Sequence, residues 1–279
     1  MRQQLKVYLL AVSLLLAVTS QAIGQQLGTL TTIDVPGASF TSGQGINPRG
    51  DIVGQYITDG VSHGFLLTGG QFASIDVPGA SFTYARGINA RGDIVGQYIS
   101  GGVSHGFLLS EGQFASIDFP GASFTTAREI NDRGDIVGRY DIAGVTHGFL
   151  LSRGQFTSID FPGASLTNAF GINPRGEIGG FYAIAGVTHG FLLSGGSFTT
   201  IDFPGASSTF CGGINPRGDI ICRYVIAGVS HGLLVSGGSF TTIDFPGASF
   251  TSLLEINAVG EIVGFYTVAG VSHGFLVSR

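Results

Sequence analysis

The sequence predicts an all-β fold, a six-bladed β-propeller of four-stranded antiparallel blades, from three observations. A His-Gly unit and an Ile-Asp unit each recur every 42 residues, six times over. Each interval contains four short runs rich in β-branched and aromatic residues, separated by Gly, Pro and Asn. The repeats begin on a fourth run and end on a third, so the N-terminal strand must pair with the C-terminal blade to complete it.

The first residues predict a secretory signal peptide, residues 1–24. Arg2 and Lys6 precede an apolar run, residues 7–18, that is too short to span a bilayer, and small residues around Ala22 suit a cleavage site. No cysteine at that site predicts a lipid anchor, and no second long apolar run predicts a membrane span. We therefore expect a secreted or periplasmic protein, with residues 25–279 forming a single six-repeat domain.

The charge balance argues against a nucleic-acid partner. Removing Arg2 and Lys6 from the 13 basic residues leaves 11 against 18 acidic ones, a formal charge of −7. Only 11% of the residues are charged, well below the usual quarter. Such a chain, rich in glycine and phenylalanine, is typical of buried strands joined by tight turns.

One repeat, residues 123–160, illustrates the four predicted strands. The first lies within residues 123–131, the second covers Asp-Ile-Val-Gly-Arg-Tyr at 135–140, the third 147–152 and the fourth 155–161. No window has the i, i+3, i+4 apolar spacing of a helix. Each repeat is therefore expected to form one small antiparallel sheet.

The connections have recognisable turn sequences. Asn-Pro-Arg-Gly at residues 47–50 predicts a type I turn followed by a left-handed glycine. Asp-Phe-Pro-Gly at residues 160–163 predicts a type II turn that crosses to the next blade.

A two-residue turn between the third and fourth strands, such as Glu111-Gly112, places His105 opposite Asp118. We expect one structural hydrogen bond of this kind in every blade, because buried polar groups find partners, as in the polar pairing that holds WD-repeat blades together. The predicted pairs are His63–Asp76, His105–Asp118, His147–Asp160, His189–Asp202, His231–Asp244 and, across the joined ends, His273–Asp34.

The sequence predicts no metal, cofactor or catalytic residue. In a sixfold ring, histidines on the third strand lie ~10 Å outside the innermost strand, so they are too far apart to share one zinc ion. Ser104 and His105 are neighbours on a strand and point to opposite faces, which excludes a serine–histidine dyad. Six near-identical copies also lack the distinct groups of an active site, so we do not expect an enzyme.

Arg-Gly-Asp occurs four times, at residues 49–51, 91–93, 133–135 and 217–219. Turn chemistry accounts for the tripeptide, and two copies depart from it with Glu177 and with Val259. We therefore interpret it as a solvated turn rather than an adhesion signal.

Cys211 and Cys222 are the only cysteines and replace small residues such as Ala169 and Gly180 of the fourth copy. They face each other directly if the intervening turn has an even number of residues, and slip by one position if it is a bulged three-residue loop. An exported protein favours a disulfide between them; the alternative is a pair of free buried thiols.

The chain resembles the extracellular HAF repeat family, named for a His-Ala-Phe core. The resemblance rests on Ile-Asn-x-x-Gly-Asp/Glu-Ile-Val-Gly followed by His-Gly-Phe-Leu, as at residues 88–96 and 105–108, and covers nearly the whole chain beyond the leader. Glycine replaces the family's alanine throughout, and Leu233 replaces phenylalanine in the fifth copy. The resemblance implies an exported bacterial repeat protein and brings no established activity.

Candidate ligand-binding residues are those that differ between copies at the first strand. If this strand is innermost, they surround the central channel, where aromatic and arginine side chains suit a sugar, a peptide or a small polar metabolite. The alternative is drift after recent duplication. The candidates are Gln44, Tyr84, Arg86, Arg128, Glu129, Asn168, Phe170, Phe210, Leu254 and Glu255.

Two functions follow from this organisation. The first is a noncatalytic binding module that recognises a glycan, a peptide or another surface ligand at the channel face. The second is an envelope or matrix scaffold that makes protein–protein contacts.

Overall fold

The computed structural model describes residues 28–278, so the predicted signal peptide, residues 1–24, lies outside the described residues. The described chain contains 24 strands in six blades. None of its elements is a helix long and apolar enough to cross a membrane.

The strands repeat with near-constant bounds. Blade one holds β2 (Phe40–Ile46), β3 (Ile52–Thr58), β4 (Val61–Thr68) and β5 (Gln71–Ile75). Blade two holds β6 (Phe82–Ile88), β7 (Ile94–Ser100), β8 (Val103–Ser110) and β9 (Gln113–Ile117). Blade three holds β10 (Phe124–Ile130), β11 (Ile136–Ile142), β12 (Val145–Ser152) and β13 (Gln155–Ile159). Blade four holds β14 (Leu166–Ile172), β15 (Ile178–Ile184), β16 (Val187–Ser194) and β17 (Ser197–Ile201). Blade five holds β18 (Ser208–Ile214), β19 (Ile220–Ile226), β20 (Val229–Ser236) and β21 (Ser239–Ile243). Blade six holds β22 (Phe250–Ile256), β23 (Ile262–Val268), β24 (Val271–Ser278) and β1 (Thr29–Ile33).

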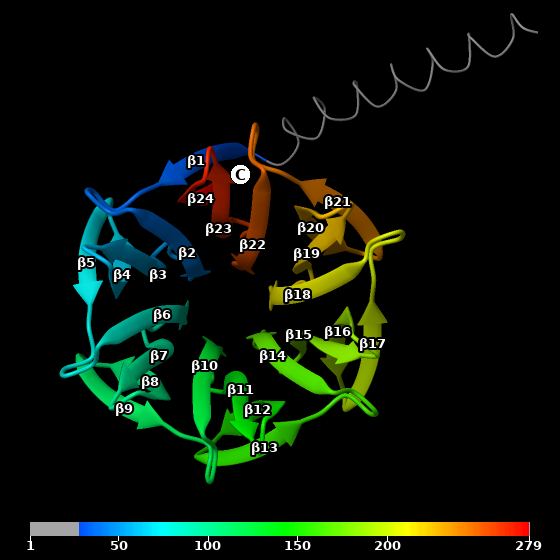
Figure 1. Ribbon diagram of the computed structural model, residues 1–279, viewed down its shortest axis with the longest axis horizontal. Coiled ribbons are helices and arrows are strands. Elements are labelled where there is room, and N and C mark those ends of the chain that lie inside the picture. The colour runs from blue at the N-terminus through cyan, green and yellow to red at the C-terminus, as the bar shows by residue number, and fades with distance from the viewer. Residues whose placement is uncertain (1–27, 279) are drawn as a thin grey trace, which may run out of the picture.

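The blades surround a central axis, with the first strand of each repeat innermost (Figure 1). Within a blade every neighbouring pair is antiparallel. In blade six, β1 pairs with β24 from Thr29 opposite Ser278 to Ile33 opposite Gly274. Figure 1 shows this junction, where the blue N-terminal strand lies beside the red C-terminal one. The predicted six-bladed propeller and its closure by the N-terminal strand are confirmed.

The connections follow the turn sequences. The Gly50 amide donates to Asn47 O at 3.0 Å, and Gly50 then takes a left-handed φ of 82°, which completes the expected type I turn with its glycine bulge. The linker between blades also forms a type II turn, with Gly163 at φ 78°. Its hydrogen bond runs from the Ala164 amide to Phe161 O, so this turn begins one residue later than the sequence predicted.

The hydrophobic core lies between adjacent blades rather than within one. A phenylalanine from the His-Gly-Phe unit is fully buried in blades one to four and in blade six. Phe191 shows how this ring is accommodated, because it lies opposite Gly180 on the neighbouring strand. A Cβ on Gly180 would lie 2.6 Å from the ring, so the ring fills space that any side chain at this position would occupy. Val137 of blade three joins Ala169 and Phe191 of blade four in one cluster, so each blade covers the apolar face of the next.

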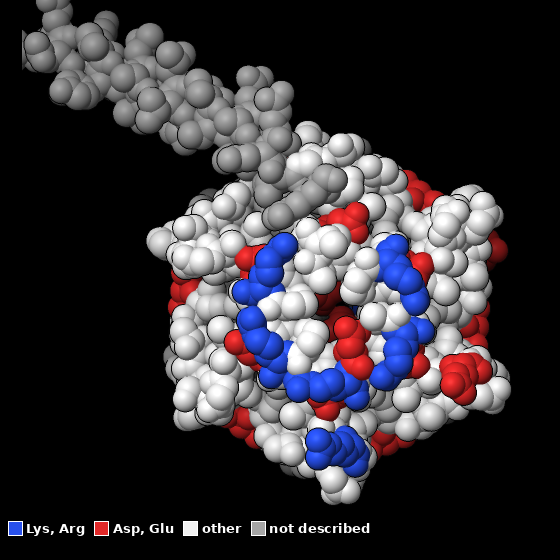
Figure 2. Space-filling model, turned by 180° about the vertical axis from the view of Figure 1, so that it is seen from behind, with Lys and Arg blue, Asp and Glu red and all other residues white. Residues whose placement is uncertain are grey.

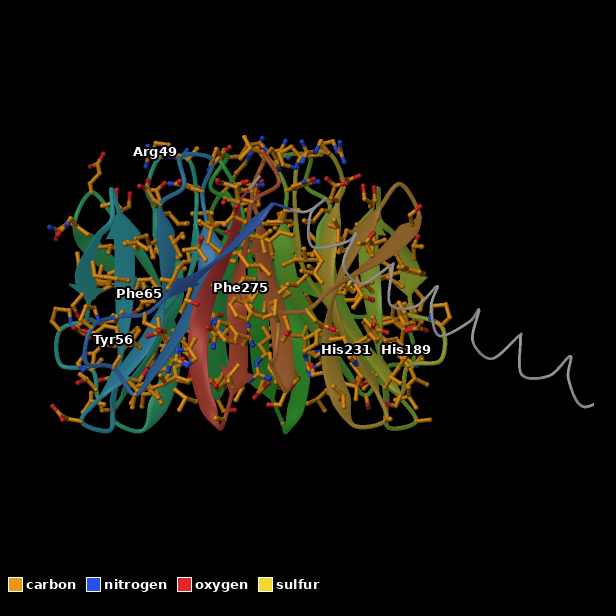
Figure 3. The ribbon with its side chains drawn as sticks, turned by 90° about the horizontal axis from the view of Figure 1, so that it is seen from above. Arg49, Tyr56, Phe65, His189, His231 and Phe275 are labelled. Atoms are coloured by element: carbon orange, nitrogen blue, oxygen red, sulfur yellow. A yellow bond between two sulfur atoms is a disulfide. The ribbon has the colours of Figure 1, made fainter. Side chains whose placement is uncertain are left out.

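The Arg-Gly-Asp turns hold neighbouring blades together. The Arg49 Nε lies 3.0 Å from Asp51 Oδ2 in its own turn, and the Arg49 guanidinium donates to Ala90 O of the next blade at 2.8 Å. Asn47 likewise donates to Asn89 O, and Asn257 closes the circle by donating to Asn47 O at 3.1 Å. These turns lie on one face, where the turn arginines form a broken blue ring (Figure 2), and Arg49 lies at that rim in Figure 3. The tripeptides at residues 49–51 and 91–93 therefore have a structural role between blades.

Candidate functional site

A β-bulge places one extra residue of each inner strand at the channel. In β2 the pairing shifts between Gly43 and Gly45, which leaves Gln44 without a partner on β3. The same shift occurs in β6, β10, β14, β18 and β22, and the extra residue lies at the channel each time. These bulge residues differ between blades: Gln44, Arg86, Arg128, Phe170, Gly212 and Leu254.

The main cavity of the channel has a volume of about 430 Å³, and no residue of the arginine turns lines it. Seven of the ten predicted binding residues line it: Gln44, Tyr84, Arg86, Arg128, Phe170, Phe210 and Leu254.

Sequence reasoning missed a second tier of lining residues on the second strands of blades four, five and six. Arg223 faces Phe210 across β18 and β19, and Phe265 faces Ser252 across β22 and β23. Phe181 and Phe250 also line the cavity. The signal was present at the residue before the tyrosine of the second strand. That residue is Gln, Gln, Arg, Phe, Arg and Phe along the six copies, while its neighbours stay nearly constant.

The arginines at the cavity stack on aromatic rings. The Arg86 guanidinium lies 3.8 Å from the Tyr84 ring centre and donates to Gln97 Oε1 at 3.0 Å. The Arg128 guanidinium lies 4.6 Å from the ring centre of Phe170 on the next blade. Burial lowers the pKa of Arg86 and holds that of Arg128 well below its usual value, and the other nearby guanidinium groups add to both effects.

Glu129 and Glu255 occupy a different part of the channel. They come from opposite blades, are each 7% exposed, and line a smaller cavity of about 80 Å³ near the arginine turns. Each accepts the backbone N–H of the following residue at 2.9 Å, and the two carboxyl groups are close enough to influence each other's pKa. Burial raises the pKa of Glu255 to about 7, and burial together with the facing Glu255 raises that of Glu129 well above its usual range. Two facing buried carboxyl groups of this kind share a proton near neutral pH.

Glycines at the equivalent positions of the other blades leave space for the two glutamate side chains. The equivalent residue is glycine in the other four blades, and a Cβ on Gly87 would lie 2.6 Å from Glu129 Oε1. The remaining predicted residue, Asn168, is 2% exposed and lines neither cavity.

The six histidine–aspartate pairs lie away from the channel. In each blade the histidine Nδ1 is 2.8 or 2.9 Å from the aspartate, including His273 and Asp34 across the closure. His189 and His231 lie toward the side of the ring opposite Arg49 (Figure 3). A tyrosine ring stacks on each histidine, as Tyr56 does on His63 at 5.2 Å. Ser104 Oγ is occupied by Gln97 and Thr125 O rather than by His105. In residues 28–278, no group of three or more His, Cys, Asp or Glu side chains could hold a metal ion.

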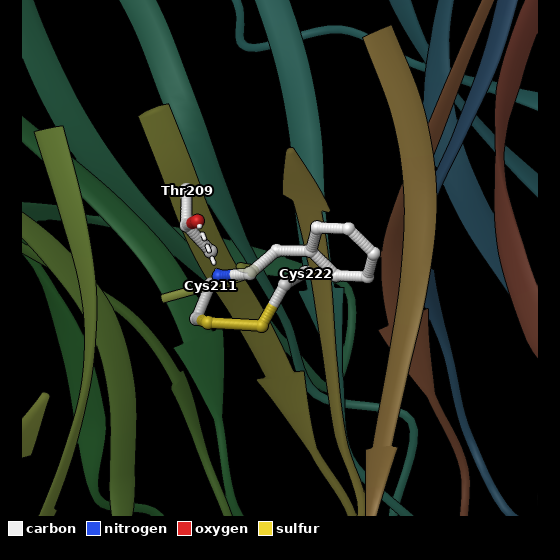
Figure 4. The surroundings of a disulfide bond; sticks show 4 residues. Thr209, Cys211 and Cys222 are labelled. Atoms are coloured by element: carbon white, nitrogen blue, oxygen red, sulfur yellow. Dashed lines mark hydrogen bonds between the residues drawn. A yellow bond between two sulfur atoms is a disulfide. The ribbon is translucent and has the colours of Figure 1, made fainter. Parts of the chain in front are cut away.

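Cys211 and Cys222 form a disulfide between β18 and β19, at the wall of the main cavity (Figure 4). The turn between these strands is a three-residue loop, which alone would set the cysteines out of register. The bulge at Gly212 and Gly213 restores the alignment, so Cys211 faces Cys222 directly. Leu233 faces Cys222 on the other side, where the other blades place a phenylalanine against glycine.

Solved structures with similar folds are β-propellers. A streptogramin B lyase is 12% identical, with a TM-score of 0.51, over 89% of this chain and 97% of that chain. A catalytically inactive virginiamycin B lyase from Staphylococcus aureus with quinupristin is 11% identical, with a TM-score of 0.53, over 90% of this chain and 99% of that chain. TolB from Acinetobacter baumannii is 12% identical, with a TM-score of 0.57, over 78% of this chain and 55% of that chain. At these identities the likeness establishes the fold alone.

No protein-family profile and no curated protein matches the chain. Membership of the HAF family therefore stays a prediction. The 42-residue repeat and its four-stranded blade are shown by the strand order and by the similar folds.

Proposed function

We propose that this protein is an exported, noncatalytic binding module that takes its ligand in the central channel. One observation carries the proposal: seven of the ten first-strand residues that differ between copies converge on one cavity, and they come from all six blades. A polar or aromatic bulge residue lies at that cavity in four of the blades, while the structural pairs of the blades stay constant. A concave site with a few convergent polar groups among aromatic rings is the usual form of a small-molecule site.

The glycan, peptide or surface ligand expected from the sequence belongs to this proposal, as do secretion and the absence of catalysis. Main-chain bulges fix the lining side chains on rigid strands, which favours recognition of a preferred ligand over loose surface contact. The constant histidine–aspartate pairs fit a structural role, because they are hydrogen-bonded within each blade and lie apart from the cavity.

The test is a binding screen of the purified protein against polysaccharides, peptidoglycan fragments, peptides and small metabolites. We expect at least one ligand that raises the melting temperature of the protein and shows saturable binding in calorimetry. The variant Phe170→Ala should lose this binding. Arg49→Gln, at a residue that does not line the cavity, is the matched control that keeps binding. A folded protein that binds nothing from any class would refute the module and favour the scaffold.

A further inference from the structure

We infer that the main cavity binds a small anion that carries an aromatic or similarly flat apolar group, such as an aromatic carboxylate or a phosphate ester. This inference rests on the proposed function, because it names the ligand class of the same cavity. Four observations support it: the placement of positive charge, the unpaired donors, the aromatic wall and the size of the cavity.

Positive charge is concentrated on one side of the cavity. Arg86 and Arg128 line it from neighbouring blades two and three, and Arg139, which does not line it, is near enough for its charge to act on both. No aspartate or glutamate lines this cavity, and none of these three arginines forms an ion pair within residues 28–278. By contrast, each of the five turn arginines pairs with a carboxylate of its own turn: Arg49, Arg91, Arg133, Arg175 and Arg217.

The same arginines have hydrogen-bond donors to spare. The Nε atoms of Arg86, Arg128 and Arg139 are buried and have no hydrogen-bond partner in the described part of the chain. Buried donors are rarely left unpaired, and a guanidinium group matches the oxygens of a carboxylate or phosphate in charge and geometry. A bound anion would therefore satisfy donors that the protein itself leaves free and offset the repulsion between neighbouring cations.

The other side of the cavity is aromatic. Its rings come from blades four, five and six, and they pack on one another: Phe181 lies edge-on to Phe210 at 5.2 Å, and Phe250 is stacked on Phe265 at 5.2 Å. Arg223 is the one cation among them, 4.0 Å from the Phe210 ring centre. Aromatic faces and edges favour another flat ring, so the apolar part of the ligand belongs on this side.

Size and polarity together exclude the other ligand classes. A volume of about 430 Å³ lies within the range of small-molecule sites. A neutral sugar would leave the arginine side uncompensated, and a basic peptide would be repelled by it. A small anion without a ring would leave the aromatic side unfilled.

The experiment compares probes that differ in one property at a time. Benzoate and phenyl phosphate carry both features, benzamide keeps the ring and lacks the charge, and acetate and inorganic phosphate keep the charge and lack the ring. Calorimetry and ligand-observed NMR on the purified protein, with probes up to millimolar concentration, measure each affinity. We expect a charged aromatic probe to bind about 10- to 100-fold more tightly than benzamide and than the anion without a ring.

Variants assign the effect to the cavity. Arg128→Gln is expected to weaken the charged aromatic probe about 10- to 100-fold, while Arg49→Gln leaves its affinity unchanged. Phe170→Leu is expected to reduce the advantage of the ring and to keep that of the charge. Whichever of benzoate and phenyl phosphate binds more tightly distinguishes a carboxylate ligand from a phosphate ligand.

The two proposals fail differently. Equal binding of benzamide and benzoate, or unchanged affinity in Arg128→Gln, would overturn the anion inference and leave a binding module in place. Absence of binding by every aromatic anion would also overturn it, and the broader screen then decides whether the cavity takes any ligand at all.

Discussion

The paired carboxyl groups of Glu129 and Glu255 make stability depend on pH at the scale of single residues. A buried carboxyl group is held in its neutral form by desolvation, and for Glu129 the facing Glu255 reinforces that effect. The folded protein therefore holds protons that the unfolded chain releases between the ordinary glutamate value of 4.5 and about 7. Since the folded pKa is raised, the stabilisation is complete below about 4.5 and is lost as the pH rises through 7.

We therefore expect Glu255→Gln to flatten this part of the stability profile. In the native protein the free energy of unfolding should fall by on the order of 2–3 kcal/mol between pH 5 and pH 8. The glutamine cannot ionise, so the variant should lose the part of that fall that Glu255 contributes and keep the part that comes from the burial of Glu129. Urea unfolding at several pH values measures it.

Glu177→Gln provides the control. Hydrogen bonds from Asn173 and Arg175 outweigh its partial burial and hold the pKa of Glu177 below its usual value, so its contribution is lost only in acid. This variant should keep the native slope between pH 5 and pH 8. An unchanged slope in Glu255→Gln would contradict the shared proton.

The hairpin of β18 and β19 illustrates how one element absorbs a departure from the repeat. In blade four, Ala169, Gly180 and Phe191 lie in one row across three strands, and in blade five the same row holds Cys211, Cys222 and Leu233. The disulfide occupies space that the phenylalanine ring fills in the other blades, and the smaller leucine makes room for it.

Converting blade five to the composition of blade four tests this exchange. Cys211→Ala with Cys222→Gly should cost about 3 kcal/mol for the lost cross-link, and more for the cavity beside Leu233. Adding Leu233→Phe should restore the packing and leave only the cost of the cross-link. Guanidinium unfolding measures both variants, and a triple variant less stable than the double would show that the ring does not fit.

At the scale of the whole molecule, the sequence predicts the ring because the repeat is long, regular and out of phase at its two ends. The positions of Gln44 and Arg128 in the channel also follow from the sequence, since variation among otherwise constant copies identifies them. The sequence does not separate Glu129 and Glu255 from the main cavity, because their placement depends on the bulge and on the glycines around them. Variation between copies also singles out the position of Arg223 on the second strand, but the bulged register that brings Arg223 beside Phe210 appears only in the fold.

Closure of the ring also predicts where the two ends of the chain can be joined. A direct link from Arg279 to Gly28 would give the sequence Ser-Arg-Gly-Thr, which matches the turn Ser-Arg-Gly-Gln at residues 152–155 in all but its last residue. We expect a circular permutant that joins Arg279 to Gly28 and opens between Arg153 and Gly154 to fold with native stability within about 1 kcal/mol, as measured by thermal and urea unfolding.

Deleting residues 25–35 is the contrasting variant. It removes Ile33, which is 6% exposed, and the partner of His273, so a loss of at least about 3 kcal/mol is expected. A permutant as unstable as this deletion would show that the sixth blade depends on more than strand pairing.

The pairing of β1 with β24 also sets the order in which the ring can be finished. The ribosome makes β1 before the other described strands and β24 after them, so β1 has no strand to pair with in its own chain until the rest of the ring has been made. Through that interval it presents an open edge, which is a template for strands of other chains. In two chains that fold next to each other, the β1 strand of each can pair with the β24 strand of the other. A high local concentration of folding chains therefore favours strand-exchanged dimers, and a low concentration favours closed monomers.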